Sequence, residues 1–172
     1  GEEALLQRAA HPKVVAIGET GLDYFRLTGD LDWQRERFRT HIRAAKRCGK
    51  PLIIHTRSAA EDTLRIMREE GAEQVGGVMH CFTESQEVAQ ASVEMGFMIS
   101  FSGIVTFRNA DPLRAVARAV PNDSLLVETD APYLTPEPHR GQPNRPAYLD
   151  LIARKVASLR DWSPAETAQR TT

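Results

Sequence analysis

The amino-acid sequence predicts an α/β fold built on parallel strands. Short apolar runs alternate with amphipathic stretches of helical period, about one such pair every 30 residues. The apolar runs are continuous rather than alternating, which is typical of parallel strands covered on both faces. A flavodoxin-like open sheet and a (β/α) barrel share this pattern. A complete (β/α)₈ barrel needs about 250 residues, so 172 residues would supply only part of one, about five strand–helix units.

The apolar runs place the strands. Five are expected, at Val14–Gly18, Pro51–His55, Gly77–Phe82, Phe97–Phe101 and Ser124–Thr129. Helices are expected between them wherever apolar residues recur at spacings of three and four. They are expected from about Asp32 to Gly49 (Phe38, Ile42, Ala45 and Cys48 on one face), over Ala60, Leu64 and Met67 to Gly71, near Ser85–Met95, from Pro112 through Leu113, Val116 and Val120, and over Ala147–Arg160.

Two further segments have a clear local signature. Asp130–Pro146 contains five prolines and is expected to be a long irregular loop. Ser163–Glu166 reads as a capping box with proline at the first helical position, and so predicts one more helix.

Composition limits the function classes. Hydrophobic residues make up 41% of the chain, and the formal net charge is -1. This balance argues against a module that grips long duplex nucleic acid, because such proteins carry a basic surplus. No apolar run reaches the roughly 20 residues that span a bilayer, and the polar opening predicts no signal peptide. Two cysteines without paired spacing, Cys48 and Cys81, suggest a reduced, cytoplasmic protein.

Ionisable residues gather where the expected strands end. Glu19 follows the first strand, His55 ends the second, His80 lies late in the third, and Glu128 and Asp130 close the fifth. The carboxyl ends of parallel strands meet at one face, where active sites form. Imidazoles and carboxylates together hold divalent ions in hydrolytic sites. The pattern therefore favours a metal site, although each residue alone has an ordinary structural explanation.

Other polar residues are open to two interpretations. Arg57 lies two residues past His55 and either binds a substrate phosphate or forms a surface ion pair. Asp23 either orients a ligand or only stabilises its turn. The proline-rich loop offers three candidates for substrate contact that are equally well explained as solvated residues: His139, Arg140 and Arg145. Structural or surface roles are expected for His11, His41 and Cys81. The chain has no GxSxG, GxxxxGK[ST] or GxGxxG motif, which disfavours serine hydrolase, P-loop and Rossmann functions.

Four segments, taken together, resemble the TatD-like metal-dependent hydrolases. Residues 16–24 (AIGETGLDY) are similar to that family's GEIGLDY segment, and residues 51–57 (PLIIHTR) to its PVIIHxR strand. Residues 79–83 (MHCFT) are similar to its HCFSG segment, and residues 126–134 (LVETDAPYL) to its LxETDAPYL segment. The four occur in the family's order and cover nearly the whole chain.

The resemblance implies a TIM-like barrel and metal-dependent hydrolysis, most often of DNA phosphodiesters from a 3′ end. By motif matching, Glu19 would bridge two divalent ions (Mg, Mn or Zn), and His55 and His80 would bind one of them. Asp130 would bind the other beside the attacking water, so Asp130 and Glu19 would be catalytic. Arg57 would lie near the substrate, with His139 and Arg140 as further substrate-binding candidates. The substrate would be nucleic acid, with no membrane partner.

The sequence also departs from the family. It has no His-x-His pair, so residues 1–172 would form one domain, the C-terminal part of a barrel without its first three strands. Arg145 stands where the family often has an acidic residue. One ion is therefore predicted on Glu19, His55 and His80. The missing His-x-His pair puts the second ion, on the side of Asp130, in question.

Alternatives therefore stay open. One is a D-aminoacyl-tRNA deacylase-like ester hydrolase, and another is a phosphate-binding barrel without metal. A third is a catalytically inactive partial barrel that acts as an interaction fragment. Exposed strand edges would favour self-association of such a chain.

Overall fold

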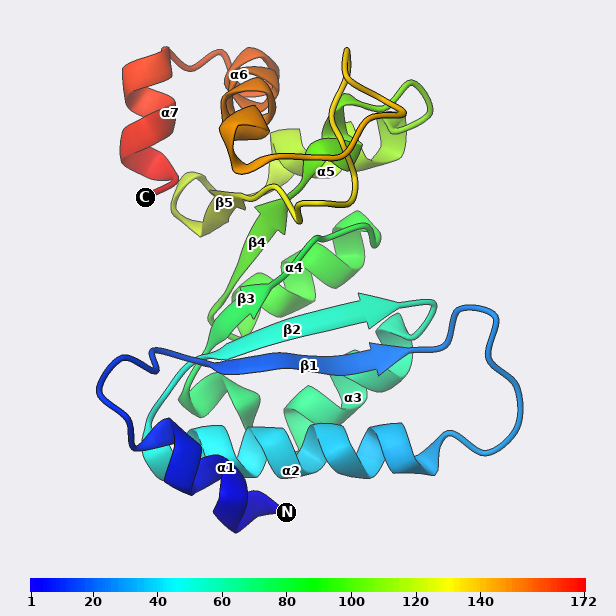
Figure 1. Cartoon of the computed structure of the whole chain (residues 1–172), viewed down its shortest axis with the longest axis vertical. Helices are drawn as coiled ribbons and strands as arrows, with labels where there is room; N and C mark the ends of the chain where they lie inside the picture. The colour runs from blue at the N-terminus through cyan, green and yellow to red at the C-terminus, as the bar shows by residue number, and fades with distance from the viewer. The chain divides into compact units, whose positions relative to one another are not determined.

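The computed structural model describes all residues, 1–172, as seven α-helices, five β-strands and short 3₁₀ turns. The strands are β1 (Ile17–Asp23), β2 (Leu52–Arg57), β3 (Gly77–Met79), β4 (Phe97–Phe101) and β5 (Leu125–Val127). The helices are α1 (Glu2–Ala9), α2 (Asp32–Cys48), α3 (Ala60–Glu69), α4 (Gln86–Glu94), α5 (Asp111–Ala119), α6 (Leu149–Arg160) and α7 (Pro164–Arg170). Figure 1 shows these elements along the chain.

The chain divides into two compact units, so each is described by itself. The first unit comprises Gly1–His80 and Ala91–Phe97, and the second comprises Cys81–Gln90 and Met98–Thr172. All described strand pairs within the units are parallel, and a helix follows each strand that leads to the next, as the α/β prediction requires. The expectation of one domain over residues 1–172 stays a prediction.

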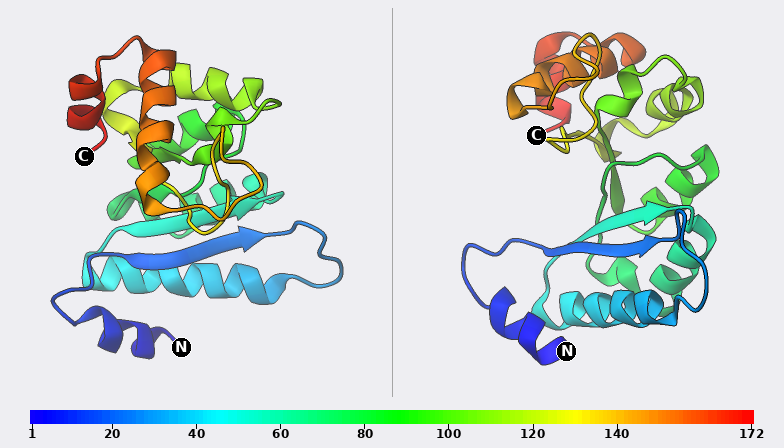
Figure 2. Two further views of the ribbon diagram at one scale, coloured as in Figure 1. Left: turned by 45° about the horizontal axis from the view of Figure 1, so that its top comes forward. Right: turned by 45° about the vertical axis from the view of Figure 1, so that its right-hand side comes forward.

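In the first unit, β1 pairs with β2 and β2 with β3. The long helix α2 runs beside β1 in every view, and α1 lies against α2 (Figures 1 and 2). Phe38, Ile42 and Ala45 of α2 are fully buried, as their spacing predicts. Gly49 ends this helix in the left-handed conformation (φ 65°), which glycine adopts without steric cost.

The first strand differs from its sequence prediction. It begins at Ile17 and continues to Asp23, so the prediction of a strand over Val14–Gly18 is wrong. Ile17 pairs with Leu52 but Thr20 pairs with Ile54, and β1 therefore has one extra residue between these pairs. Such a bulge redirects side chains next to it. Glu19 consequently lies within the strand rather than after it.

Of the other strands, β4 has the expected bounds, β2 continues past its expected end at His55 to Arg57, and β3 and β5 are shorter than expected. β3 stops at Met79 instead of Phe82, and β5 covers only Leu125–Val127. His80 therefore follows its strand, and His55 lies two residues before the end of β2. Hydrogen bonds continue beyond the strands, since His80 N donates to Ile54 O (2.8 Å).

In the second unit, β4 pairs with β5, and α6 packs against α5, α7 and β5. Its core includes Ile99, Phe101, Leu125, Ile152 and Val156, all fully buried. Figure 1 shows α6 followed by α7 at the C-terminal end of the chain.

Local signals in this unit are confirmed as well. Pro112 lies in the first turn of α5, and Ser163 Oγ accepts a hydrogen bond from Glu166 N at the start of α7. Residues 130–145 form no helix or strand. No helix of the chain has the length and apolar character needed to cross a membrane.

Candidate metal centre

In the first unit, side chains alternate along the strands, and the polar candidates of β1 and β2 lie on the sheet face away from the helices. Thr20 and Leu22 of β1 are buried on the side of the helices, and Thr20 Oγ1 lies 2.9 Å from His41 Nδ1 of α2. Successive strand residues point to opposite faces, so Glu19, Gly21 and Asp23 belong to the other face. In β2, the residues of that other face are His55 and Arg57. The acidic and basic candidates thus share the sheet face that the helices leave open.

Gly21 determines how closely the two strands approach at this point. It is paired with His55 across the ladder, and its φ is +132°. A Cβ at Gly21 would lie 1.9 Å from the backbone oxygen of His55. A residue with no side chain is therefore required here. The imidazole of His55 contacts the residues two positions before and two positions after Gly21, which are Glu19 and Asp23.

Two imidazoles converge on one carboxylate oxygen. His55 Nδ1 lies 3.3 Å and His80 Nε2 lies 3.9 Å from Glu19 Oε1. Ligands at about 2.1 Å around a tetrahedral ion are about 3.4 Å apart, so these separations suit donors around one cation. Imidazole nitrogen with carboxylate oxygen is also the donor set that divalent hydrolytic metals take. The residues of the first unit therefore fit a divalent ion.

Asp23 lies at the other side of the His55 ring. Its Oδ2 is 2.9 Å from His55 Nε2, and its two oxygens receive hydrogen bonds from Arg57 Nε at 3.1 and 2.9 Å. Burial raises the pKa of the Asp23 carboxyl, but the hydrogen bonds from Arg57 and His55 more than offset this, and the pKa lies below its ordinary value. Asp23 is therefore ionised at neutral pH.

A hollow of about 230 Å³ adjoins this cluster. It is lined by Glu19, Thr20, Gly21, Asp23, Gln34, Arg37 and His55. The sequence analysis missed two of these, Gln34 and Arg37, because both belong to α2 and are far from the strand ends in sequence. The periodicity of α2 marks its apolar face, and a polar residue elsewhere on the helix gives no separate signal.

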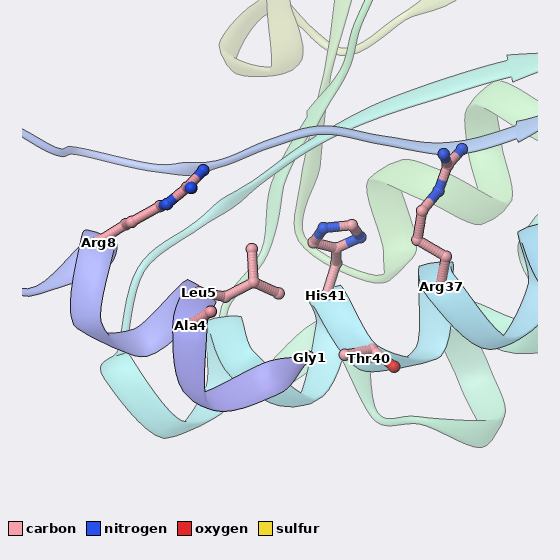
Figure 3. A pocket seen from close by; sticks show the side chains of 7 residues that line it. All are labelled: Gly1, Ala4, Leu5, Arg8, Arg37, Thr40 and His41. Atoms are coloured by element: carbon pink, nitrogen blue, oxygen red, sulfur yellow. The ribbon is translucent and has the colours of Figure 1, made fainter.

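A second hollow, of about 430 Å³, lies between α1 and α2 (Figure 3). The side chains of Arg8, His41 and Arg37 point from the helices toward β1. His41, for which a structural or surface role is expected, has a partly buried ring that contacts Thr20, and burial lowers its pKa. None of the metal-ligand candidates lines this hollow. His11, by contrast, is exposed, as expected for a surface residue.

The second unit contains the remaining acidic candidates. Glu128 follows β5 directly, and its Oε2 accepts a hydrogen bond from Cys81 N (3.0 Å). Asp130 lies beyond the strand with φ +56°, a left-handed conformation that aspartate tolerates better than most residues. Its carbonyl accepts from Tyr133 N, which begins the long loop as a turn. That Asp130 joins Glu19, His55 and His80 stays a prediction.

Within the long loop, two of the three candidates make internal contacts. His139 stacks on Tyr148 with ring centroids 4.4 Å apart. The Arg140 guanidinium lies 3.8 Å from the centre of the Phe107 ring and donates to Thr135 O (3.0 Å). Arg145 is exposed. The first two side chains thus stabilise the loop, and their contact with substrate stays a prediction.

The loop is also held by a residue that the sequence analysis did not single out. Asn144 is buried, and its amide donates to Thr129 O (2.7 Å) and Tyr133 O (2.6 Å). These bonds join the two ends of the segment that contains Asp130. An asparagine among prolines is an ordinary turn signal, so the sequence alone does not reveal this role.

Comparison with known proteins identifies the family. The model of the "TatD related DNase" family matches residues 1–172. The chain is 52% identical over 170 residues to the uncharacterized metal-dependent hydrolase YcfH of Escherichia coli (strain K12), covering 99% of this chain and 64% of YcfH. It is 37% identical over 175 residues to the 3'-5' ssDNA/RNA exonuclease TatD of Escherichia fergusonii, covering 99% of this chain and 67% of that protein.

A solved structure agrees with the sequence matches. The chain superposes on the crystal structure of YJJV, a TatD homologue from Escherichia coli K12, with a TM-score of 0.86 and 34% identity, over 98% of this chain and 64% of YJJV. The chain thus spans about two thirds of the length of the relatives it matches. It belongs to the TatD-related DNase family and has the α/β fold of that family's TIM-like barrels.

Proposed function

We propose that this protein is a metal-dependent hydrolase whose ion is held by Glu19, His55 and His80. The observation that carries the proposal is the approach of two imidazole nitrogens, at 3.3 and 3.9 Å, to one oxygen of Glu19. Relatives named as metal-dependent hydrolases support it. The donor set accepts Mg²⁺, Mn²⁺ or Zn²⁺, with one or two ions per site.

The proposed chemistry is hydrolysis of an ester bond by water. A divalent ion in such a site polarises a phosphoryl oxygen and lowers the pKa of water. We assign Asp130 the task of accepting the proton from the attacking water, and Glu19 is the second proposed catalytic carboxylate. Arg57 would hold a substrate phosphate, because a guanidinium binds phosphate through two parallel hydrogen bonds. His139 and Arg140 would contact the substrate further along.

The proposed substrate is nucleic acid, and the family resemblance favours DNA attacked from its 3′ end. One relative is named a 3'-5' ssDNA/RNA exonuclease, and this supports a single-stranded substrate. The net charge of -1 fits an enzyme that holds a few nucleotides locally better than one that grips a long duplex. A cytoplasmic location stays a prediction.

The test combines substrate, chelator and a variant. The full chain is incubated with end-labelled single-stranded DNA, RNA and D-aminoacyl-tRNA, each with and without EDTA. We expect shortening of the DNA from its 3′ end, loss of this activity in EDTA, and recovery on adding Mn²⁺. His55→Ala should abolish ion uptake and turnover with unchanged circular dichroism. His11→Ala is the matched control, since this exposed histidine lies outside the site and its removal should change neither quantity.

Each alternative gives a different result. Turnover of D-aminoacyl-tRNA without shortening of either oligonucleotide would favour the deacylase. A folded chain that takes up an ion but turns over none of the three substrates would favour the inactive interaction fragment. Hydrolysis that EDTA leaves unchanged, or a wild-type chain without ion uptake, would contradict the proposal.

A further inference from the structure

Asp23 contacts three different groups in the first unit. Its Oδ2 lies 2.9 Å from His55 Nε2, and its Oδ1 accepts from Phe25 N at 3.0 Å. Arg57 approaches the same carboxylate with Nε and with Nη2, the latter 2.9 Å from Oδ2. The side chain is 29% exposed, so these contacts are only partly screened by solvent. One carboxylate thus links the proposed metal ligand His55 to the proposed phosphate-binding Arg57.

The contact with His55 determines which ring nitrogen is available to an ion. An ionised carboxylate only accepts hydrogen bonds. In the neutral ring, the proton therefore resides on Nε2, where it is donated to Asp23, and Nδ1 keeps its lone pair. Nδ1 is the nitrogen that faces Glu19 Oε1 at 3.3 Å. Metal-binding histidines commonly donate their second N–H to a carboxylate, which orients the ring and fixes its tautomer.

The backbone of Asp23 is held by α2. The side chain of Gln34, which is 3% exposed, accepts from Asp23 N and donates to Asp23 O, both at 2.9 Å. This pair of bonds attaches the end of β1 to α2. The guanidinium of Arg57 lies 4.6 Å from the centre of the Phe25 ring. The backbone of Asp23 is therefore anchored to α2, and its partner Arg57 contacts both Asp23 and the Phe25 ring.

We propose that Asp23 is a positioning residue of the metal centre, an inference that rests on the proposed function. It holds the proton of His55 on Nε2 so that Nδ1 is the ligand nitrogen, and it orients Arg57 beside that ligand. Nε and Nη2 of the Arg57 guanidinium face Asp23. The remaining N–H donors of Arg57 would then bind a phosphate of the substrate. Asp23 acts through these two residues and needs no contact with the reacting atoms.

The competing interpretation is that Asp23 only braces the turn after β1. Its bond with Phe25 N, two residues ahead, is of the kind that stabilises such turns. Asp23→Asn separates the two roles. The asparagine oxygen can still accept from Phe25 N, which places the amide nitrogen opposite His55 Nε2. Two donors cannot share that position, so the His55 proton is driven to Nδ1, the side that faces Glu19.

The experiment compares Asp23→Asn with Asp62→Asn in the full chain. Asp62 is a matched control because it is 27% exposed, belongs to the same unit and accepts bonds from Tyr24 (2.7 Å) and Arg65 (2.6 Å) without touching His55. Co²⁺ affinity is measured from visible absorption. The protonated nitrogen of His55 is read from ¹⁵N NMR of the metal-free protein near pH 9, where imidazole is neutral. The melting temperature from thermal unfolding shows whether the turn after β1 is destabilised.

For Asp23→Asn we expect a shift of the ring proton from Nε2 to Nδ1, a 10- to 100-fold loss of Co²⁺ affinity, and little change in melting temperature. Asp62→Asn should retain the wild-type tautomer and affinity. An Asp23→Asn protein with the wild-type tautomer and wild-type affinity would overturn the inference and leave the proposed function intact. A wild-type chain that binds no Co²⁺ would instead contradict the proposed function itself. If Asp23→Asn does not fold, Asp23→Ser, which keeps an acceptor for Phe25 N without presenting an amide, replaces it with the same criterion for affinity.

Discussion

At the scale of single residues, Gly21 sets the geometry of the candidate site. It allows β1 to approach the backbone of His55, whose ring contacts Glu19 and Asp23 on either side of Gly21 in the sequence. Any side chain at this position meets the His55 carbonyl group. The glycine is therefore required by a contact with the next strand rather than by a turn.

Gly21→Ala should consequently destabilise the protein strongly, by about 3 kcal/mol or more, because both the positive φ and the overlap with backbone are penalised. Gly29→Ala is a matched control: Gly29 also has a positive φ (+90°), but nothing lies within 4 Å of a Cβ there. It should cost only about 1 kcal/mol. Urea unfolding measures both values, and equal losses for the two variants would argue against the close approach.

At the scale of elements, the helix ends follow the chain's local chemistry. α7 begins at Pro164, and Ser163 Oγ accepts from Glu166 N at 3.1 Å. The carboxylate of Glu166 pairs with Arg170 Nε at 3.0 Å within the same helix. The cap predicted from the sequence therefore forms through the serine, and the glutamate stabilises the helix along its length.

Ser163→Ala removes the acceptor for a backbone N–H at the start of α7 and should lower the free energy of unfolding by about 1 kcal/mol. Ser158→Ala provides the comparison, since Ser158 is exposed within α6 and alanine is the better helix former there. Its expected effect is close to zero. Guanidinium unfolding monitored by circular dichroism distinguishes the two, and an unchanged midpoint for Ser163→Ala would show that the cap contributes nothing.

At the scale of the whole molecule, strand edges matter most. β1 has β2 as its strand partner and β5 has β4, so each of these two strands has one side without a partner strand in this chain. Val15, just before β1, is 77% exposed. Unpaired strand edges with apolar residues favour pairing between chains.

We therefore expect sedimentation equilibrium to show reversible association of the 19.2 kDa chain as its concentration rises. Val15→Lys should weaken this association, because a charge beside the edge opposes strand pairing. Leu149→Lys, at a half-exposed position on α6, serves as the control and should leave it unchanged. A single 19.2 kDa species at all concentrations would rule out edge pairing.

The sequence by itself determined the alternation of strands and helices, the buried face of α2, the irregular loop and the cap of α7. These features depend on residues near one another in the chain, where periodicity and hydrogen-bonding chemistry act directly. It also singled out Glu19, His55 and His80, because the carboxyl ends of parallel strands meet at one face and bring such residues together.

Tertiary structure decided what joins those residues. β1 continues past its bulge to Asp23, which pairs with Arg57 of β2, and strand alternation then puts Asp23 on the same face as Glu19. Alternation along a strand would have predicted that Glu19 and Asp23 share a face, but the sequence predicted that this strand ends at Gly18. Gln34 and Arg57 meet Asp23 from a helix and from another strand. Such contacts depend on register and on the approach of two backbones, and register is set by packing between segments that are distant in sequence.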